Sequence, residues 1–117
     1  GRFSDFVGDL EFSVTAPQSA KTLLDDFPTV LVFDADKIPK GSVIRCRRAG
    51  DAFRKFGGAK KSLNDYFTDK KIPIRKRDSI PLVCVGSEVY LVCGVEISDN
   101  IKLDEKSSRA AACIYRR

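Results

Sequence analysis

The chain has 117 residues, a length that fits one folded domain, and 43% of its residues are hydrophobic. A net charge of only +5 and this apolar content exclude a disordered chain. No apolar run approaches the ~20 residues of a membrane span, and the N-terminal stretch lacks the apolar core of a signal peptide. The chain begins with Gly1 and contains no methionine. We therefore expect residues 1–117 to form a single domain cut from a longer protein, with no membrane contact.

Positive charge is concentrated in one part of the chain. Residues 45–77 contain twelve Lys and Arg and three acidic residues, whereas the rest contains nine Lys and Arg and thirteen acidic residues. Surfaces that face only water usually mix both signs, and a one-sided field attracts an anionic partner. The clustering therefore favours a polyanion-binding face. The alternative is that these cations are close in sequence but not in space.

Three strands are predicted in the first half of the chain. L-E-F-S-V-T (residues 10–15) alternates apolar and polar side chains, as a half-buried strand does. T-V-L-V-F-D-A-D (residues 29–36) is a continuous β-prone run, which indicates a buried strand. A turn marked by Pro39 and Gly41 separates it from a third strand over residues 42–48.

The third predicted strand has two different faces. Side chains alternate along a strand, so Ile44 and Cys46 are expected to point inward, and Arg45 and Arg47 to project together from the opposite face. The A-G-D sequence that follows predicts a turn, in which Asp51 caps the turn or orients a nearby arginine. The next six residues, F-R-K-F-G-G, are predicted to form a loop.

The sequence S-L-N-D-Y-F-T-D-K-K predicts the one clear helix. Ser62 is a suitable N-cap, and Asp65 three residues later completes a capping-box pattern. Leu63, Tyr66 and Phe67 would share one apolar face. Two lysines at the end of the helix suit the negative end of its dipole.

The remaining sequence is rich in strand signals. Ile72-Pro73 ends the helix or starts a new turn, and a hairpin with a type II′ turn at Gly86-Ser87 follows. Pairing across this turn places Cys84 opposite Val89. S-S-R-A-A-A-C-I-Y-R-R predicts a last strand. Many strands with one clear helix predict an α+β domain.

Cysteine and histidine content argues against catalysis or metal binding. None of the four cysteines forms a C-x-x-C pair, and no histidine is present to bind zinc or act as a general base. We expect small buried thiols in a reducing cytoplasm, with a disulfide as the alternative. Asp34 and Asp36 resemble paired metal ligands, but we expect them to close a strand and to bond backbone or arginine groups.

Two lysines before the predicted helix suggest a phosphate site. Lys60 and Lys61 precede the end of the helix that carries partial positive charge, where lysines are locally unfavourable. Gly57 and Gly58 would allow a ligand to approach the backbone closely, and a helix N-terminus favours anions. The alternative is that both lysines point to water.

Arginines on either side of this segment would extend the site into a track, because a guanidinium donates two hydrogen bonds to a phosphate. The track would consist of Arg45, Arg47, Arg48, Arg75, Lys76 and Arg77. Phe53 and Phe56 lie among these cations and would either stack on an unpaired base or belong to the core.

The segment F-D-A-D-K-I-P-K-G-S-V-I-R-C-R-R-A-G-D-A-F resembles the C-terminal domain of the bacterial tRNA(Ile)-lysidine synthetases. That domain shows D-A-D at a strand end, then R-x-R-x-x-G-D-x-F, a glycine, a K-K-L-like helix start, K-I-P, an arginine and a proline-led strand. The matching positions here are Asp34-Ala35-Asp36, Arg45, Arg47, Gly50, Asp51, Phe53, Gly57 or Gly58, Lys60, Lys61, Leu63, Lys71-Ile72-Pro73, Arg77 and Pro81. The family often has a proline between the phenylalanine and the glycine, where this chain has the more basic Arg54-Lys55-Phe56.

This resemblance implies a cytoplasmic ligase that uses ATP to activate the wobble cytidine of an isoleucine tRNA precursor and attaches lysine there. ATP and Mg²⁺ would belong to an N-terminal catalytic domain with an S-G-G-x-D-S loop, which this sequence lacks. The fragment itself is expected to be non-catalytic and to hold no cofactor. The implied fold is layered, with a β-sandwich of mixed strands and one or two short helices.

In that family the C-terminal domain binds tRNA, including the acceptor stem. The residues that we expect to contact tRNA are Arg45, Arg47, Arg48, Phe53, Lys60, Lys61, Arg75 and Arg77. One alternative is an interdomain docking module that places its basic face on an acidic protein surface. A second is a small enzyme acting on nucleotides, which the lack of histidine and of a phosphate-binding loop disfavours.

Overall fold

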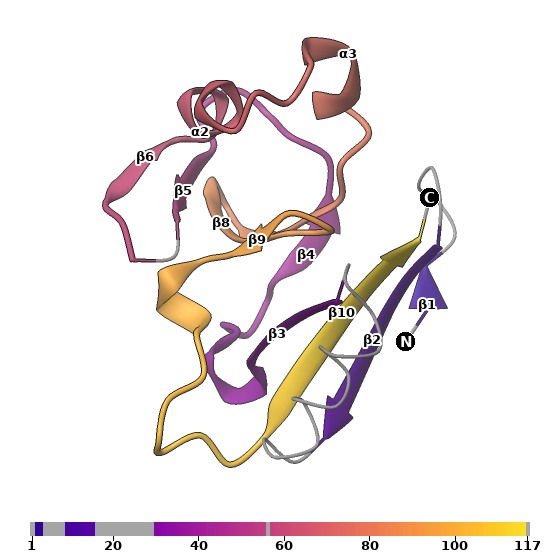
Figure 1. Ribbon diagram of the computed structural model, residues 1–117, viewed down its shortest axis with the longest axis vertical. Helices are drawn as coiled ribbons and strands as arrows, with labels where there is room; N and C mark the ends of the chain where they lie inside the picture. Colours follow the sequence, from indigo (N-terminus) through magenta and orange to yellow (C-terminus); the bar gives the residue numbers. More distant parts are fainter. Residues whose placement is uncertain (1, 4–8, 16–29, 56, 117) are drawn as a thin grey trace.

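A computed structural model describes residues 2–3, 9–15, 30–55 and 57–116, which form two β-sheets and a helical layer (Figure 1). Neighbouring strands of the four-stranded sheet are antiparallel, and their order is β1 (Arg2–Phe3), β2 (Asp9–Thr15), β10 (Ala110–Arg116) and β3 (Val30–Asp34). The six-stranded sheet has the order β4 (Val43–Arg45), β7 (Leu82–Val85), β8 (Glu88–Val92), β5 (Ala52–Arg54) and β6 (Lys60–Ser62), and β9 (Glu96–Ile97) also pairs with β8. The helices are α2 (Leu63–Asp69), α3 (Ile74–Arg77) and the short 3-10 turns η1 (Ala35–Lys37) and η2 (Asp99–Ile101).

A hydrophobic core joins the two sheets. Phe33 on β3 and Cys113 on β10 pack in one cluster with Val83 on β7 and Leu91 on β8. Alternation along the strands turns these side chains inward from both sheets, as in a β-sandwich. The domain is therefore an α+β fold with layered sheets and few short helices, as the sequence predicted.

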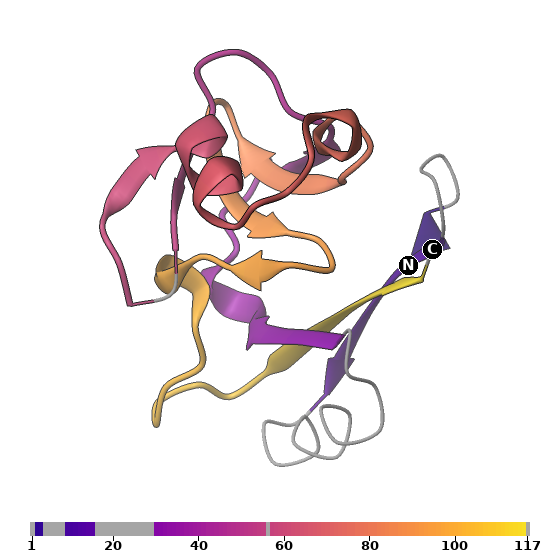
Figure 2. The same cartoon turned by 45° about the horizontal axis from the view of Figure 1, so that its top comes forward.

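A second core lies between α2 and the other face of the six-stranded sheet. Leu63, Tyr66 and Phe67, the predicted apolar face of the helix, are all buried there. They pack against Phe53 on β5 and Leu82 on β7, among others. As a result, α2 lies on the side of the six-stranded sheet that faces away from the four-stranded sheet (Figures 1 and 2).

Several local predictions are confirmed. Ser62 caps α2 by accepting a hydrogen bond from the Asp65 N–H at 3.1 Å. The hairpin turns at Gly86, which has a φ of +56° as the first central residue of a type II′ turn requires. Cys84 pairs with Val89 across this hairpin.

The segment between residues 46 and 62 differs from the prediction. β4 ends at Arg45, three residues earlier than expected, because the chain turns away from the sheet at Cys46. The predicted F-R-K-F-G-G loop begins with β5, which pairs in parallel with β8 and antiparallel with β6. Strand pairing with a segment thirty-six residues away overrides the local loop signal.

Cysteines and acidic residues have structural roles. All four cysteines are free; Cys46 is half-buried and the other three are buried. Asp34 ends β3 and accepts hydrogen bonds from the Asp36 N–H and the Ser107 hydroxyl at 2.8 and 2.7 Å. Asp36 pairs with Arg109. The predicted strand-closing and arginine-binding roles of these acids are confirmed.

Within the described residues, no group of three or more His, Cys, Asp or Glu is placed to hold a metal ion. The same residues contain no helix long and apolar enough to cross a membrane.

Candidate nucleic-acid interface

A buried ion pair between Arg45 and Asp51 holds the β4–β5 loop. Two guanidinium nitrogens of Arg45 donate to the two carboxylate oxygens of Asp51 at 2.9 and 2.8 Å, and the side chains are only 11% and 2% exposed. The same guanidinium donates to the carbonyl oxygens of Cys46 and Gly86. The Arg48 N–H donates to the Asp51 carboxylate. Asp51 therefore orients an arginine and closes the turn, as predicted.

This pair commits Arg45 to the fold. Burial alone would raise the pKa of the Asp51 carboxyl, but hydrogen bonds and positive charge from Arg45 and Arg48 outweigh it, and the pKa is lowered. The hydrogen bond to Asp51 raises the pKa of Arg45. The prediction that Arg45 and Arg47 project together from one face of the strand is wrong, because the Arg45 guanidinium turns inward to the carboxylate.

Arg47 ties the β4–β5 loop to both helices. Its Nε donates to Asp78 Oδ1 at 2.7 Å, and its Nη1 donates to Asn64 Oδ1 at 2.8 Å. Asn64 belongs to the first turn of α2, and Asp78 is the C-cap of α3. Arg48 is exposed, and its side chain has no hydrogen-bond or ion-pair partner in the described part of the chain. The loop and the two helices thus form one continuous surface.

A small cavity of about 250 Å³ opens on this surface. It lies where the β4–β5 loop meets the first turn of α2, and Arg47, Arg48 and Asn64 are among its lining residues. Asp51 also lines the cavity, but its carboxylate is paired with Arg45. The two guanidinium groups and the amide suit an anionic or hydrogen-bonding ligand group.

Lys60 and Lys61 lie on β6 rather than in a loop. Lys60 pairs with Glu88 at 2.7 Å, and Lys61 pairs with Asp69. The Gly57 N–H donates to Asp99 Oδ1, and the Gly58 N–H donates to a backbone carbonyl. The glycine N–H groups that the predicted phosphate site requires are therefore already used within the fold. The two lysines remain half-exposed or exposed beside that segment.

Of the three cations on α3, one is held by contacts within the fold and two are exposed. The Arg77 Nε donates to the Ile72 carbonyl oxygen at 2.9 Å, and its guanidinium lies 5.8 Å from the centre of the Phe67 ring. Arg77 thus fixes α3 onto α2. Arg75 and Lys76 are exposed, and neither side chain has a partner among the residues described.

Lys71, between the two helices, was not among the expected contacts. It is exposed and is the one non-glycine residue of the described chain with a positive φ, at +58°. No local sequence signal marks this conformation, although Lys71 lies in the K-I-P segment noted above. Four exposed cations of this surface have side chains with no hydrogen-bond or ion-pair partner among the described residues. We call them the helix-side cations: Arg48, Lys71, Arg75 and Lys76.

Phe53 lies in the core. Its ring is 0% exposed and packs 4.7 Å from the Tyr66 ring. The expectation that Phe53 contacts RNA is wrong, because strand β5 turns it toward α2 rather than toward solvent. Phe56 lies outside the described residues.

Comparison with known proteins identifies the family. The family model described as "TilS substrate C-terminal domain" matches residues 43–113, more than half of the chain. The chain belongs to this family. Its match includes the β4–β5 loop, both helices and the hairpin.

Curated relatives of this TilS domain are much longer proteins. The tRNA(Ile)-lysidine synthase of Caldanaerobacter subterraneus subsp. tengcongensis is 35% identical over 120 residues, which cover 98% of this chain and 23% of that protein. The tRNA(Ile)-lysidine synthase of Clostridium acetobutylicum is 39% identical over 87 residues, covering 74% of this chain and 19% of the relative. The chain therefore spans about a quarter or less of these relatives.

A solved structure supports the fold. The one described as "Crystal structure of TILS C-terminal domain" superposes with a TM-score of 0.67 at 22% identity, covering 92% of this chain and 82% of that chain. This TilS fold is thus also found in a solved chain of similar size.

Proposed function

We propose that this chain is the tRNA-binding part of a tRNA(Ile)-lysidine synthase and that RNA phosphates bind to its helix-side cations. The observation that carries the proposal is that four exposed cations lie on a surface of a TilS-family domain and that their side chains form no hydrogen bond or ion pair among the described residues. Such cations are free to pair with RNA phosphates, and this pairing releases counterions from the RNA.

Paired cations at the edge of this surface would add to the site. Arg47 pairs with Asp78, which is 77% exposed, and Lys61 pairs with Asp69, which is 56% exposed. Exposed ion pairs contribute little to stability, so a phosphate competes with these carboxylates at low cost. Lys60 is 51% exposed and would contribute in the same way. Arg45 and Arg77 would act indirectly, because their hydrogen bonds hold the loop and α3 that carry the others.

The chemistry of lysidine formation would belong to the remainder of the longer protein. The relatives are named tRNA(Ile)-lysidine synthase, and this name implies tRNA as the substrate of the longer protein. The sequence resemblance implies that ATP and Mg²⁺ bind to an N-terminal catalytic domain. In this proposal the present chain acts in the cytoplasm as a non-catalytic RNA-binding domain that helps to position the tRNA.

A salt titration of binding tests this proposal. The ligand is a fluorescent acceptor-stem minihelix of an isoleucine tRNA precursor, and the readout is anisotropy. We expect a log–log slope of roughly −3 to −6, which corresponds to about four to seven phosphate contacts. Tighter binding than to a methionine-tRNA stem would indicate a discriminating module. No binding even at low salt would contradict the proposal and favour docking on an acidic protein surface.

A further inference from the structure

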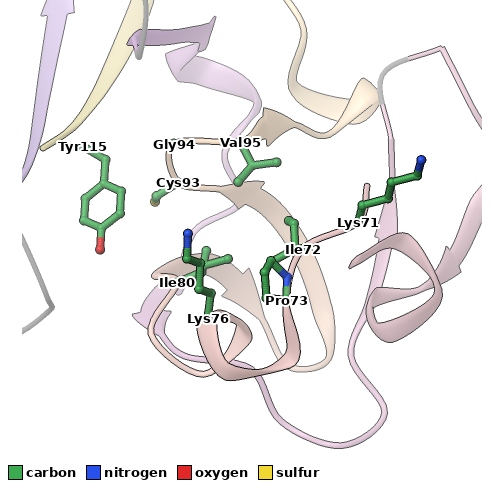
Figure 3. A pocket seen from close by; sticks show the side chains of 9 residues that line it. All are labelled: Lys71, Ile72, Pro73, Lys76, Ile80, Cys93, Gly94, Val95 and Tyr115. Atoms are coloured by element: carbon green, nitrogen blue, oxygen red, sulfur yellow. The ribbon is translucent and has the colours of Figure 1, made fainter. Parts of the chain in front are cut away.

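A larger and a smaller cavity near α2 differ in the chemistry of their walls. The larger, of about 390 Å³, lies between the end of β10 and the α2–α3 connection, and its walls are mainly apolar. Lys71 and Lys76 are the charged side chains among the residues that Figure 3 shows around it. The smaller, of about 250 Å³, is the one at the β4–β5 loop, and its wall includes two arginines, Arg47 and Arg48. The smaller cavity is therefore the better site for a charged ligand group.

The guanidinium of Arg47 is held in place and still has hydrogen atoms to donate. Its Nε donates to Asp78 at 2.7 Å, and its Nη1 donates to Asn64 at 2.8 Å. Its Nη2 has no hydrogen-bond partner within the described residues. Two existing bonds fix the plane of the guanidinium, so a ligand that binds to Nη2 orders little additional structure.

Two further side chains offer donors to the same space. The Arg48 guanidinium is exposed and has no hydrogen-bond or ion-pair partner among the residues described. Asn64 uses its Oδ1 to accept from Arg47, and its Nδ2 has no partner in the described part of the chain. Gly50 adds no side chain to the wall. The cavity thus gathers three side-chain donor groups around one small volume.

Carboxylates near the cavity already have cationic partners. Asp51 lines the wall, but it is 2% exposed and accepts from the Arg45 guanidinium and from the Arg48 N–H. Asp78 pairs with Arg47 and is 77% exposed, so an anionic ligand competes with it at low cost. Three arginines and two carboxylates leave a net positive charge at this site.

From this geometry we infer that the smaller cavity binds the 5′-terminal phosphate of the RNA. The inference rests on the proposed RNA-binding function. A terminal phosphate has three free oxygens and a charge of about −1.5 to −2 at pH 7, which three donor groups with two guanidinium forks match. A phosphate within the strand has two free oxygens and a sugar on each side. It fits less well into a cavity that is smaller than most small-ligand pockets.

Three RNA hairpins of one sequence test the inference on the 117-residue chain. They carry a 5′-hydroxyl, a 5′-phosphate or a 5′-methyl phosphate, and anisotropy of a 3′ fluorophore measures binding at one salt concentration. We expect the 5′-phosphate to tighten binding about tenfold or more over the 5′-hydroxyl, as new hydrogen bonds to a charged group do. The methyl phosphate has one free oxygen and one charge fewer, so its gain should be about threefold or less.

An exchange of amide for carboxylate locates this gain. Asn64→Asp keeps the acceptor for Arg47 but replaces the Nδ2 donor with a carboxylate oxygen, which repels a phosphate. The gain should therefore disappear. A carboxylate suits the first turn of α2, so the urea midpoint should stay the same or rise. The matched control, Asn100→Asp, introduces the same charge at an exposed position of η2 and should keep the gain.

An exchange of arginine for lysine tests the role of the guanidinium. Arg48→Lys keeps the charge but loses the two-pronged donor, so it should reduce the gain several-fold. Arg75→Lys is the same exchange on α3, outside the lining of the cavity, and should keep the gain. The gain is a ratio within each variant, so a change in affinity that all hairpins share cancels.

The outcomes separate this inference from the proposed function. If no hairpin binds, the RNA-binding function itself fails. If the 5′-hydroxyl and 5′-phosphate hairpins bind equally, RNA binding stands and the terminal-phosphate site is refuted. A gain that survives in Asn64→Asp, or that is equally large for the methyl phosphate, also refutes it. Loss of the gain when inorganic phosphate equimolar with the hairpin is added would assign the cavity to a free anion.

Discussion

The two ends of the molecule carry charge in different ways. The end formed by residues 34–40 and 99–109 has five acidic residues and five Lys and Arg, and it includes the pairs Lys37–Asp104 and Arg109–Asp36 (Figure 1). Residues 60–77, which contain both helices, have two acidic residues and seven Lys and Arg. Balanced charge holds loops together at the first end. The excess at the second end lies on the surface that we propose to bind RNA.

The largest effect is expected for the buried pair that supports this surface. Asp51→Ala leaves Arg45 without its carboxylate in a site where its side chain is 11% exposed. Breaking a buried pair in this way costs about 3–5 kcal/mol of unfolding free energy. Asp36→Ala removes the acid of an exposed pair at the other end and should leave the urea midpoint nearly unchanged. Equal midpoints for the two variants would show that the Arg45–Asp51 pair has no special structural role.

The second prediction compares equal losses of charge at the two ends. Arg48→Ala with Arg75→Ala should weaken binding of the minihelix about tenfold or more at low salt, and should reduce the log–log slope by about 1.4–1.8. Lys40→Ala with Lys106→Ala removes two exposed cations from the balanced end. This matched pair should change affinity and slope little. If both double variants lose affinity equally, binding depends on net charge rather than on the helix side.

The third prediction separates stability from binding at Lys71. Lys71→Gly relieves a positive φ, so the unfolding free energy should stay the same or rise by up to about 1 kcal/mol. Affinity for the minihelix should nevertheless fall about threefold, because one phosphate contact is lost. Parallel urea and anisotropy titrations measure the two quantities. A variant that gains stability and keeps full affinity would show that Lys71 does not contact the RNA.

The smallest effect is expected on the stability of the fold at low pH. The folded state lowers the pKa of Asp51, so this carboxyl stabilises the fold above its unfolded pKa of about 3.9, and the contribution is lost as pH falls through the lower folded value. Wild type should therefore lose stability more steeply than Asp51→Asn below about pH 4. Urea midpoints measured from pH 5 downward report both slopes. Identical slopes would mean that Asp51 does not titrate with folding.

Local chemistry made part of the structure predictable. The capping of α2 by Ser62 depends on residues only a few positions apart, as does the turn at Gly86. The motif that contains Arg45 and Asp51 indicated the family correctly, and it also predicted the turn between β4 and β5. In each case the signal and the structure that it predicts lie within one short segment.

Contacts between distant segments account for what the sequence did not reveal. Phe53 was considered for RNA because its neighbours are cations, but pairing of β5 with β8 places it under α2. Arg45 was expected to project together with Arg47 and to contact tRNA, but it reaches both Asp51 and the Gly86 carbonyl oxygen, forty-one residues away. Which cations lack an acid partner also depends on the whole fold, so Lys71 was not selected.

A chemical-shift map of the RNA-binding face tests the central claim most directly. Unlabelled minihelix would be titrated into the 15N-labelled domain, and amide shifts would be followed for each residue. The account predicts the largest shifts at Arg48, Asn64, Lys71, Arg75 and Lys76, and small shifts in residues 34–40 and 99–109. Saturable shifts centred on residues 34–40 and 99–109, with the helix side unchanged, would contradict it.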